Sequence, residues 1–157
     1  MNRSNQEFHI REIEPTDLAR ICTLCAEHAA YEGSVYSFDG KEQALHKLLF
    51  GEPKQIYGLV ALINGFIVGY ATYTIDFSTW EARPYLHLDC LYLIQEARGR
   101  GVGKALIQQV ANMGLLHGCT QMQWQTPVEN RNAIEFYQHL GALGLEKVRF
   151  FMTTENL

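Results

Sequence analysis

The sequence predicts an α/β protein, built as a central mixed sheet with helices on its faces. Apolar runs of strand length recur along the chain, and segments with the apolar spacing of a helix separate them. A glycine-rich turn joins one of these strands to the longest helix. The 157 residues, 47% of them apolar, suit a single domain over residues 1–157.

The first third of the chain predicts one strand and two helices. Residues 8–13 alternate between apolar and polar side chains, which is typical of a strand. Pro15 lies where a helix start tolerates proline, and the apolar spacing continues to about Tyr31. Gly33 ends that helix, and residues 38–50 predict the second, with leucines on its inner side.

The middle of the chain predicts three strands. Residues 56–63 and 66–75 are rich in β-branched and aromatic side chains, and the Asn64-Gly65 pair between them is typical of a hairpin turn. Residues 85–94 predict a further strand, and the glycine-rich turn follows it directly.

The last third predicts two helices and the closing strands. A helix runs from the glycine-rich turn to about His117, and a short strand covers residues 121–126. The strands on either side of this helix should be parallel because a crossover helix joins them. A helix covers residues 130–140, with Asn130 suited to be its N-cap. Residues 143–152 are expected to close the sheet as one or two strands.

The glycine-rich turn has the sequence Arg98-Gly99-Arg100-Gly101-Val102-Gly103-Lys104. Its glycines let the backbone bend sharply and leave N–H groups open to an anion, and the helix that follows adds its positive dipole end. A Walker A loop is disfavoured because Ala105 stands where that loop needs a hydroxyl group. A dinucleotide-binding turn is disfavoured because its glycines have a different spacing. The segment predicts either a phosphate or diphosphate site or an ordinary turn.

The composition limits which kinds of partner the protein can bind and in which cellular compartment it is expected. The net charge of −4 and the lack of a basic stripe outside the glycine-rich turn argue against nucleic-acid binding. No apolar run approaches the ~18 residues that span a bilayer, and the first residues lack a signal-peptide core. We expect a cytoplasmic protein that binds neither nucleic acid nor membranes.

The four cysteines are expected to be reduced and packed. Cys22 and Cys25 have the spacing of redox and zinc pairs, but the apolar pattern places them inside a helix, away from the end that activates thiolates. Cys90 and Cys119 stand alone, so no second pair completes a zinc site. We therefore expect no metal.

Two groups of residues together resemble the signatures of the GCN5-related N-acetyltransferase (GNAT) family. The family's acetyl-CoA loop, Gln/Arg-x-x-Gly-x-Gly/Ala, is matched by Arg98, Gly101 and Gly103. Its second signature is matched by Asn130, Ala133, Phe136, Tyr137 and Gly141. The resemblance extends over essentially the whole chain. It implies a mixed, mostly antiparallel sheet of six to seven strands, splayed between strands 4 and 5, with about four helices on its faces.

Within the family, the chain resembles the diamine (spermidine/spermine-type) acetyltransferase branch. The similar segments are residues 30–32, 77–80 and 84–88. That branch usually carries Glu-Asp on the fourth strand, where this chain has Asp89-Cys90. The departure shortens one carboxylate and removes another, so the base and the polyamine specificity both stay open.

The resemblance implies acetyl-CoA as co-substrate, a small-molecule amine as acceptor, and no metal. It places these residues at the cofactor: Leu91, Leu93, Arg98, Gly99, Arg100, Gly101, Val102, Gly103, Lys104, Asn130 and Tyr137. The backbone of Leu91 and Leu93 would pair with the pantetheine arm, and the Leu91 N–H would polarise the thioester carbonyl. Many relatives pair through sheet edges, so we expect a homodimer.

The resemblance also implies the residues that act on the amine. Tyr137 would be the general acid for the departing CoA thiolate, and Asp89 would be a base, a relay or a structural carboxylate. Tyr31, Glu32, Trp80 and Asp89 would line the amine pocket. Two alternatives stay open, namely acetylation of a protein lysine or N-terminus, and a non-catalytic acyl-CoA-binding module.

Overall fold

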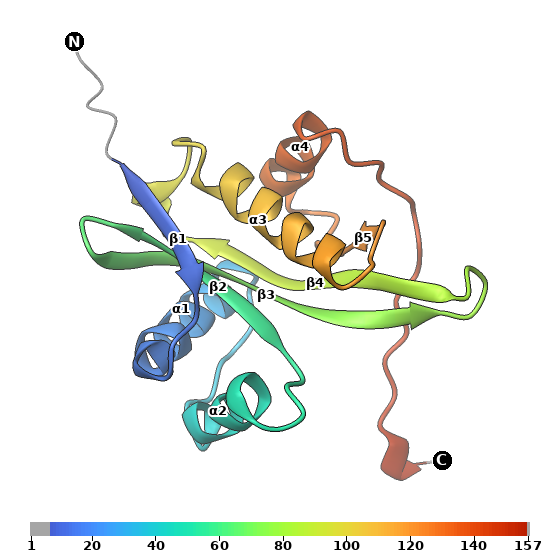
Figure 1. The fold of residues 1–157 in the computed structure, drawn as a ribbon, viewed down its shortest axis with the longest axis horizontal. Helices are drawn as coiled ribbons and strands as arrows, with labels where there is room; N and C mark the ends of the chain where they lie inside the picture. The colour runs from blue at the N-terminus through green and yellow to red at the C-terminus, as the bar shows by residue number, and fades with distance from the viewer. Residues whose placement is uncertain (1–6, 157) are drawn as a thin grey trace. The chain divides into compact units, whose positions relative to one another are not determined.

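The computed structural model describes residues 7–156 (Figure 1). The described chain forms two compact units, the first ending at Gln125 and the second beginning at Thr126. The first unit holds the sheet and three α-helices, and the second holds a further α-helix and the C-terminal segment. The single domain that the sequence predicts over residues 1–157 stays a prediction.

Five strands of the described chain form one sheet in the order β1-β2-β3-β4-β5. They are β1 (Phe8–Glu12), β2 (Tyr57–Ile63), β3 (Phe66–Ser78), β4 (Arg83–Leu93) and β5 (Met122–Gln123). The first four pair antiparallel, and β5 pairs parallel with β4. The structure thus confirms the mixed, mostly antiparallel sheet and its one parallel pair.

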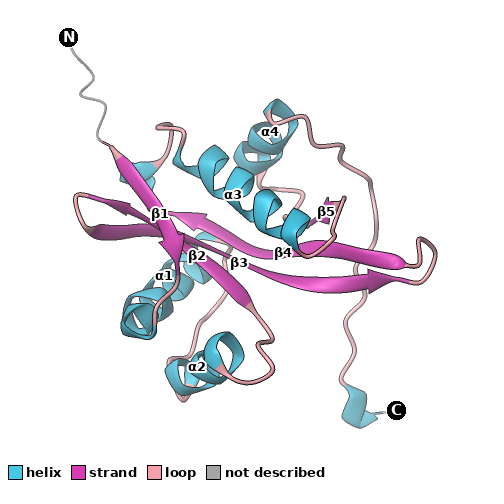
Figure 2. Cartoon of the chain, viewed as in Figure 1, coloured by secondary structure: helices cyan, strands magenta, loops and turns pink. Residues whose placement is uncertain are grey.

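The helices cover both faces of the sheet. The first unit contains α1 (Leu18–Tyr31), α2 (Lys41–Phe50) and α3 (Val102–Leu116), with 3-10 turns at Pro15–Asp17 and Gln95–Ala97. α1 and α2 lie on one face and α3 lies on the other, as Figure 1 and Figure 2 show. The second unit contains α4 (Arg131–His139) and a 3-10 turn at Thr154–Asn156. The four α-helices agree with the number that the resemblance implies.

Each face of the sheet has its own buried core, which holds the helices in place. On the α3 face, Leu106 packs in one cluster with Leu86 of β4. On the α1 face, Leu24 packs in one cluster with Val60 of β2 and Tyr70 of β3. All five side chains are at most 1% exposed. Burial of each apolar side chain of this size contributes about 1.5–3 kcal/mol to folding.

The Asn64-Gly65 turn joins β2 to β3 as the sequence predicts. Both residues have positive φ, 51° for Asn64 and 79° for Gly65, as a type I′ turn requires. Asparagine and glycine tolerate this conformation better than other residues, and its twist matches that of the flanking strands. The hairpin is confirmed.

A β-bulge interrupts β4 at Asp89. Thr72 of β3 pairs with Cys90 and Tyr73 pairs with Leu88, so Asp89 is an extra residue without a partner on β3. Because of the extra residue, the side chains of β4 that face α3 are at even positions before the bulge and at odd positions after it. Four leucines face the α3 core across this shift: Leu86, Leu88, Leu91 and Leu93.

Two expectations about strands are wrong. β5 is limited to Met122–Gln123 and does not span residues 121–126. None of the described residues 142–153 forms a strand, so the sheet has five strands in place of six or seven. A strand that closed the sheet would bury some of its apolar side chains, but Leu143 is 85% exposed and Phe150 is 90% exposed. A segment becomes a strand only where a neighbouring strand supplies hydrogen bonds, and none pairs with it in the described chain.

Candidate active site

The glycine-rich turn folds as an open loop at the start of α3. Gly99 and Gly101 have φ values of 71° and 82°, which glycine adopts more readily than other residues. A Cβ atom added to either glycine would meet no heavy atom within 4 Å, so the space beside this backbone is open. Gly101 is the N-cap of α3, and its position leaves the helix without a side-chain cap.

The first N–H groups of α3 are available to an anion. The helical ladder begins at Ala105, whose N–H donates to the Gly101 carbonyl at 3.0 Å. The N–H groups of Val102, Gly103 and Lys104 precede that bond and donate to no backbone carbonyl in the described chain. The first turn of α3 has no acidic side chain, so the helix dipole favours a negative group here. The loop therefore fits a phosphate or diphosphate.

The edge of β4 that leads to this loop lacks a neighbouring strand. β5 pairs with β4 only at Leu86 and His87, which leaves the edge unpaired up to Leu93 within the described residues. Ile94 donates its N–H to β3 at 2.9 Å. Because backbone groups alternate in direction along a strand, those of Leu91 and Leu93 point away from β3, toward the unpaired edge.

The bulge at Asp89 creates this arrangement. Before the bulge, the even-numbered Leu86 faces the outer edge, where its N–H donates to the Gln121 carbonyl at 2.9 Å. After the bulge, the odd-numbered Leu91 and Leu93 face that edge. An extended ligand with amide groups fits here as one more short strand. The unpaired edge agrees with the splaying between strands 4 and 5 that the resemblance implies.

The Arg98 side chain reaches back from the loop to β4 and α1. Its Nε donates to the Leu93 carbonyl at 2.9 Å. The guanidinium carbon lies 4.7 Å from the centre of the Tyr31 ring and 5.6 Å from that of Tyr92. The Arg98 guanidinium therefore contacts two aromatic rings and a carbonyl, although the resemblance places this residue at the cofactor.

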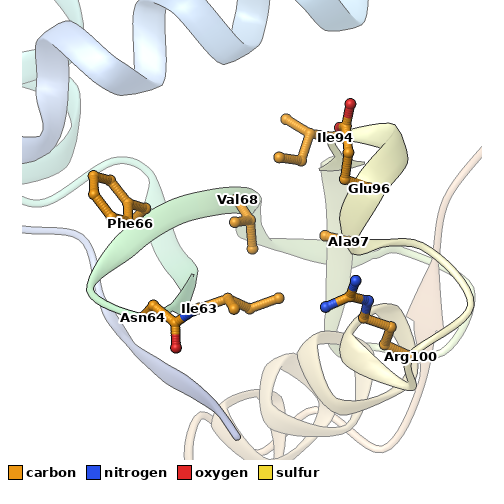
Figure 3. Close-up of a pocket in the computed structure, with 8 residues that line it drawn as sticks. All are labelled: Ile63, Asn64, Phe66, Val68, Ile94, Glu96, Ala97 and Arg100. Carbon is orange, nitrogen blue, oxygen red and sulfur yellow. The ribbon is translucent and has the colours of Figure 1, made fainter. Parts of the chain in front are cut away.

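A hollow of about 260 Å³ lies on the other side of the loop, beside the β2–β3 turn (Figure 3). Its lining is mostly apolar and consists of Ile63, Asn64, Phe66, Val68, Ile94, Glu96, Ala97 and Arg100. Figure 3 shows the Arg100 guanidinium pointing into it. Arg100 is the single predicted cofactor residue in this lining, so we treat the hollow as a feature separate from the open edge.

An aromatic cluster at the end of α1 was not predicted from the sequence. His28 Nδ1 lies 3.2 Å from the Tyr70 hydroxyl, and its Nε2 lies 3.3 Å from a carboxylate oxygen of Glu32. The His28 ring stacks on Tyr92, with centroids 5.1 Å apart and planes at 21°. Tyr31 also contacts Tyr92, at 6.5 Å between centroids. The one available signal was the i,i+4 spacing of His28 and Glu32 on a predicted helix.

The groups buried beneath this cluster are neutral. Tyr70 is 1% exposed, and burial raises the pKa of its hydroxyl far above the ordinary value. Burial also raises the pKa of the Cys90 thiol to about 12. The Cys90 thiol donates weakly to Asp89 Oδ2 at 3.6 Å. A neutral thiol cannot replace the family's second carboxylate as a base at neutral pH.

Two carboxylates lie on the β3–β4 ribbon. Asp89 is exposed at the bulge. Asp76 accepts a hydrogen bond from the Thr74 hydroxyl at 3.1 Å and lies 4.0 Å from His87 Nδ1. A cationic amine that approached this ribbon would meet favourable charge.

The structure does not bring all the predicted amine-pocket residues together. Tyr31 and Glu32 join the aromatic cluster near Tyr92, whereas Trp80 lies in the β3–β4 turn and is 97% exposed. Arg83, just after that turn, and Tyr92 are nine residues apart on one strand, or about 30 Å at 3.3 Å per residue. One compact pocket cannot be lined by both ends of β4.

The second unit contains the other family signature. Asn130 is the N-cap of α4, and its side-chain oxygen accepts the Ala133 N–H at 3.3 Å. Tyr137 is half-buried in the last turn of α4, with its ring 5.3 Å from that of Phe136. The N-cap expected for Asn130 is confirmed, and the proposed acid role of Tyr137 stays a prediction.

Residues 7–156 contain no group of three or more His, Cys, Asp or Glu side chains that would hold a metal ion. All four cysteines are free thiols, and Cys22 and Cys25 lie within α1 as expected. None of the described helices combines the length and apolarity that crossing a bilayer requires.

Comparison with known proteins identifies the family. The model of the acetyltransferase (GNAT) family matches residues 20–142. The chain is 34% identical over 144 residues to the thialysine N-ε-acetyltransferase of Bos taurus, covering 87% of this chain and 84% of that protein. It is 30% identical over 95 residues to the aminoglycoside N(6′)-acetyltransferase type 1 of Salmonella typhimurium, covering 59% of this chain and 66% of that protein.

The fold has a close counterpart among solved structures. An aminoglycoside N-acetyltransferase in complex with CoA superposes with a TM-score of 0.81, at 23% identity, over 98% of this chain and 99% of that chain. At this identity the likeness concerns the fold alone. The family match, in contrast, runs from α1 to beyond α4 and includes both signatures. This chain therefore belongs to the GNAT family and is an N-acetyltransferase.

Proposed function

We propose that this protein transfers the acetyl group of acetyl-CoA directly to a primary amine of a small molecule, in the manner of a diamine or thialysine acetyltransferase. The observation that carries the proposal is the unpaired β4 edge, which leads to the open N-terminus of α3. The edge fits the amide-bearing pantetheine arm, and the N–H groups of residues 102–104 fit the diphosphate. Bound acetyl-CoA supplies the activated acetyl group.

The backbone of β4 has the first role in the transfer. The Leu91 N–H faces the open edge, where it would donate to the thioester oxygen as negative charge develops. The amine nitrogen forms a bond to the acetyl carbon, and the carbon–sulfur bond breaks. We assign Tyr137 to protonate the departing sulfur, which returns CoA as a thiol. The nitrogen loses its remaining extra proton as the amide forms, and this proton restores the Tyr137 hydroxyl.

The second role is removal of a proton from the amine. An alkyl amine with a pKa near 10.4 is almost wholly protonated at pH 7, and freeing its lone pair costs about 4–5 kcal/mol. Cys90 is half-buried and neutral, so Asp89 is the carboxylate that we propose to attract the ammonium group and accept its proton.

The acceptor class follows from the charges and the relatives. Glu32, Asp76 and Asp89 favour a cationic acceptor. The relatives include thialysine N-ε-acetyltransferases and a spermidine/spermine N(1)-acetyltransferase-like protein of Homo sapiens. We therefore propose a short, flexible molecule with a terminal primary amine.

The test is release of CoA thiol from acetyl-CoA with a panel of diamines, polyamines, thialysine, aminoglycosides and lysine peptides. Turnover with thialysine or short diamines at a kcat/KM at least about tenfold above that with peptides is expected. Turnover with peptides alone would contradict the acceptor class. Tight CoA binding without turnover on the panel would favour the non-catalytic alternative.

We also propose that the protein is a cytoplasmic homodimer; the compartment rests on the sequence alone. The dimer is supported by the C-terminal segment, which exposes several large apolar side chains, among them Leu143, Leu145, Val148, Phe150 and Phe151. Exposed apolar side chains that are grouped, rather than scattered singly, mark interaction surfaces. A second copy of the chain is the partner that we propose to cover it.

A further inference from the structure

Arg98 connects the two halves of the proposed site. Its backbone belongs to the glycine-rich turn, and its Nε donates to the Leu93 carbonyl on the unpaired edge at 2.9 Å. Its guanidinium carbon lies 4.7 Å from the Tyr31 ring centre and 5.6 Å from that of Tyr92. Tyr31 is the last residue of α1. One side chain thus links the cofactor loop, the sheet edge and the end of a helix.

The partners of Arg98 differ in how firmly they are held. Tyr92 stacks on His28, and His28 is anchored by the buried Tyr70 hydroxyl at 3.2 Å. Tyr31 is 47% exposed, and α1 ends just after it, before Gly33 with a φ of 75°. A half-exposed ring at a helix end loses rotamer freedom when a neighbour holds it. Arg98 and Tyr92 both contact this ring.

A guanidinium group is suited to this position. It is planar and always charged, and it packs on aromatic faces while its N–H groups donate in the same plane. Arg98 does both at once, stacking near two rings and donating to a carbonyl. The open N–H groups of residues 102–104 and the α3 dipole already supply an anion site without it.

We propose that Arg98 is a positioning residue for the acceptor amine: it holds the Tyr31 ring and thereby makes amine binding depend on occupancy of the glycine-rich turn. This inference rests on the proposed function. A ligand that orders the turn also orders the Arg98 backbone, and Arg98 in turn holds the Tyr31 ring in place. The amine then binds against an ordered Tyr31 ring next to Glu32. By linkage, the amine strengthens acetyl-CoA binding by the same factor.

Steady-state kinetics of Arg98→Ala separates this role from phosphate binding. We expect KM for the amine at saturating acetyl-CoA to rise about fivefold or more, while the Kd of CoA in the absence of amine changes less than about twofold. Arg98→Lys should behave like Arg98→Ala, because lysine keeps the charge but not the planar contact. A rise in the Kd of CoA without amine that equals or exceeds the rise in amine KM would overturn the proposal.

A double-mutant cycle with Tyr31→Leu identifies the contact. Arg98→Ala is expected to have no further effect on the amine KM once Tyr31 has been replaced. An equal effect in both backgrounds would contradict the proposed link. Arg83→Ala is the control for loss of a positive charge, since Arg83 is exposed and belongs to no proposed binding residue set. An equal rise in amine KM for Arg83→Ala would attribute the effect to net charge and overturn the proposal.

Hydrogen exchange gives a readout that does not require turnover. Saturation with CoA should slow exchange at residues 101–104 in both the wild type and Arg98→Ala, but at residues 30–33 in the wild type alone. Protection at the loop without protection at residues 30–33 in the wild type would refute the coupling while leaving the proposed function intact. A further outcome is that CoA protects both segments in the wild type while the protein acetylates no amine on the panel. That result would support the coupling and contradict the proposed acceptor class.

Discussion

At the scale of single residues, the ion pair of Arg11 and Asp17 fixes the entry to α1. The two guanidinium nitrogens of Arg11 donate to the two Asp17 carboxylate oxygens at 2.6 and 3.0 Å. Asp17 also accepts the Glu14 N–H at 2.8 Å, and its side chain is only 7% exposed. The hydrogen bond from Arg11 holds the pKa of Asp17 below its ordinary value.

Asp17→Asn is expected to lower the free energy of unfolding at pH 7 by about 1–3 kcal/mol, measured by urea denaturation. Because the folded-state pKa of Asp17 is lowered, the contribution is complete above the unfolded-state pKa of about 3.9 and is lost as the pH falls through the folded-state value. The difference between wild type and variant should therefore shrink below about pH 4. Asp39→Asn, an exposed aspartate, is the control; equal stabilities of Asp17→Asn and Asp39→Asn would refute the assignment.

At the same scale, Tyr137 is the residue that we propose as the general acid. Tyr137→Phe is expected to lower kcat about tenfold or more and to leave KM for acetyl-CoA nearly unchanged, since it removes a proton donor and keeps the ring. Measurement of both constants at saturating amine tests this. Unchanged turnover would remove Tyr137 from the mechanism and leave it a packing residue of α4.

At the scale of elements, the packing of β3 against β4 requires a glycine at position 69. A Cβ atom there would lie 2.5 Å from the Tyr92 carbonyl oxygen and would also overlap the Leu93 side chain. Gly69→Ala is expected to cost about 1–3 kcal/mol of unfolding free energy and to raise KM for acetyl-CoA, because Leu93 borders the open edge. Gly144→Ala, whose Cβ would meet nothing within 4 Å, is the control. Equal melting temperatures for the two variants would contradict the packing argument.

The sequence predicted the elements better than it predicted their register. The strand before the glycine-rich turn was expected, and so were the hairpin at Asn64 and the helix after Gly101. The bulge at Asp89 was missed, although the sequence contained its signal. Leucines at 86 and 88 and then at 91 and 93 keep the two-residue period on each side and shift its phase between them.

The part of the candidate site that is made of backbone N–H groups could be predicted from the sequence. The contacts between side chains were harder to predict. Glycine spacing at a strand-to-helix junction specifies open N–H groups, which the structure shows at residues 102–104. The contact of Arg98 with Tyr31 joins residues 67 positions apart, and the contact of His28 with Tyr70 joins residues 42 positions apart. Such pairs depend on packing that local patterns do not encode. Trp80 lies at the other end of β4 from Tyr92, because similarity of segments does not fix their separation along a strand.

At the scale of the whole molecule, we propose that the apolar side chains of the C-terminal segment are buried by a second copy of the chain. They would then be covered without forming the closing strand that the sequence predicted. The full chain of 17.9 kDa is expected to run as a species of twice that mass in size-exclusion chromatography with light scattering. Truncation after Ala142 should give a monomer, because it removes the exposed apolar side chains. Phe150→Asp with Phe151→Asp is a milder variant with the same expected outcome. A monomeric full-length chain would contradict the dimer.

The central claim is that bare peptide N–H groups at the start of α3 and along the outer edge of β4 together bind acetyl-CoA. A ¹H–¹⁵N chemical-shift titration of the full chain with CoA tests it most directly. The account predicts saturable shifts of the amides of Leu91, Leu93 and residues 101–104 with a single dissociation constant. Saturation with no response at these amides, and shifts confined to the hollow around Phe66, would contradict it.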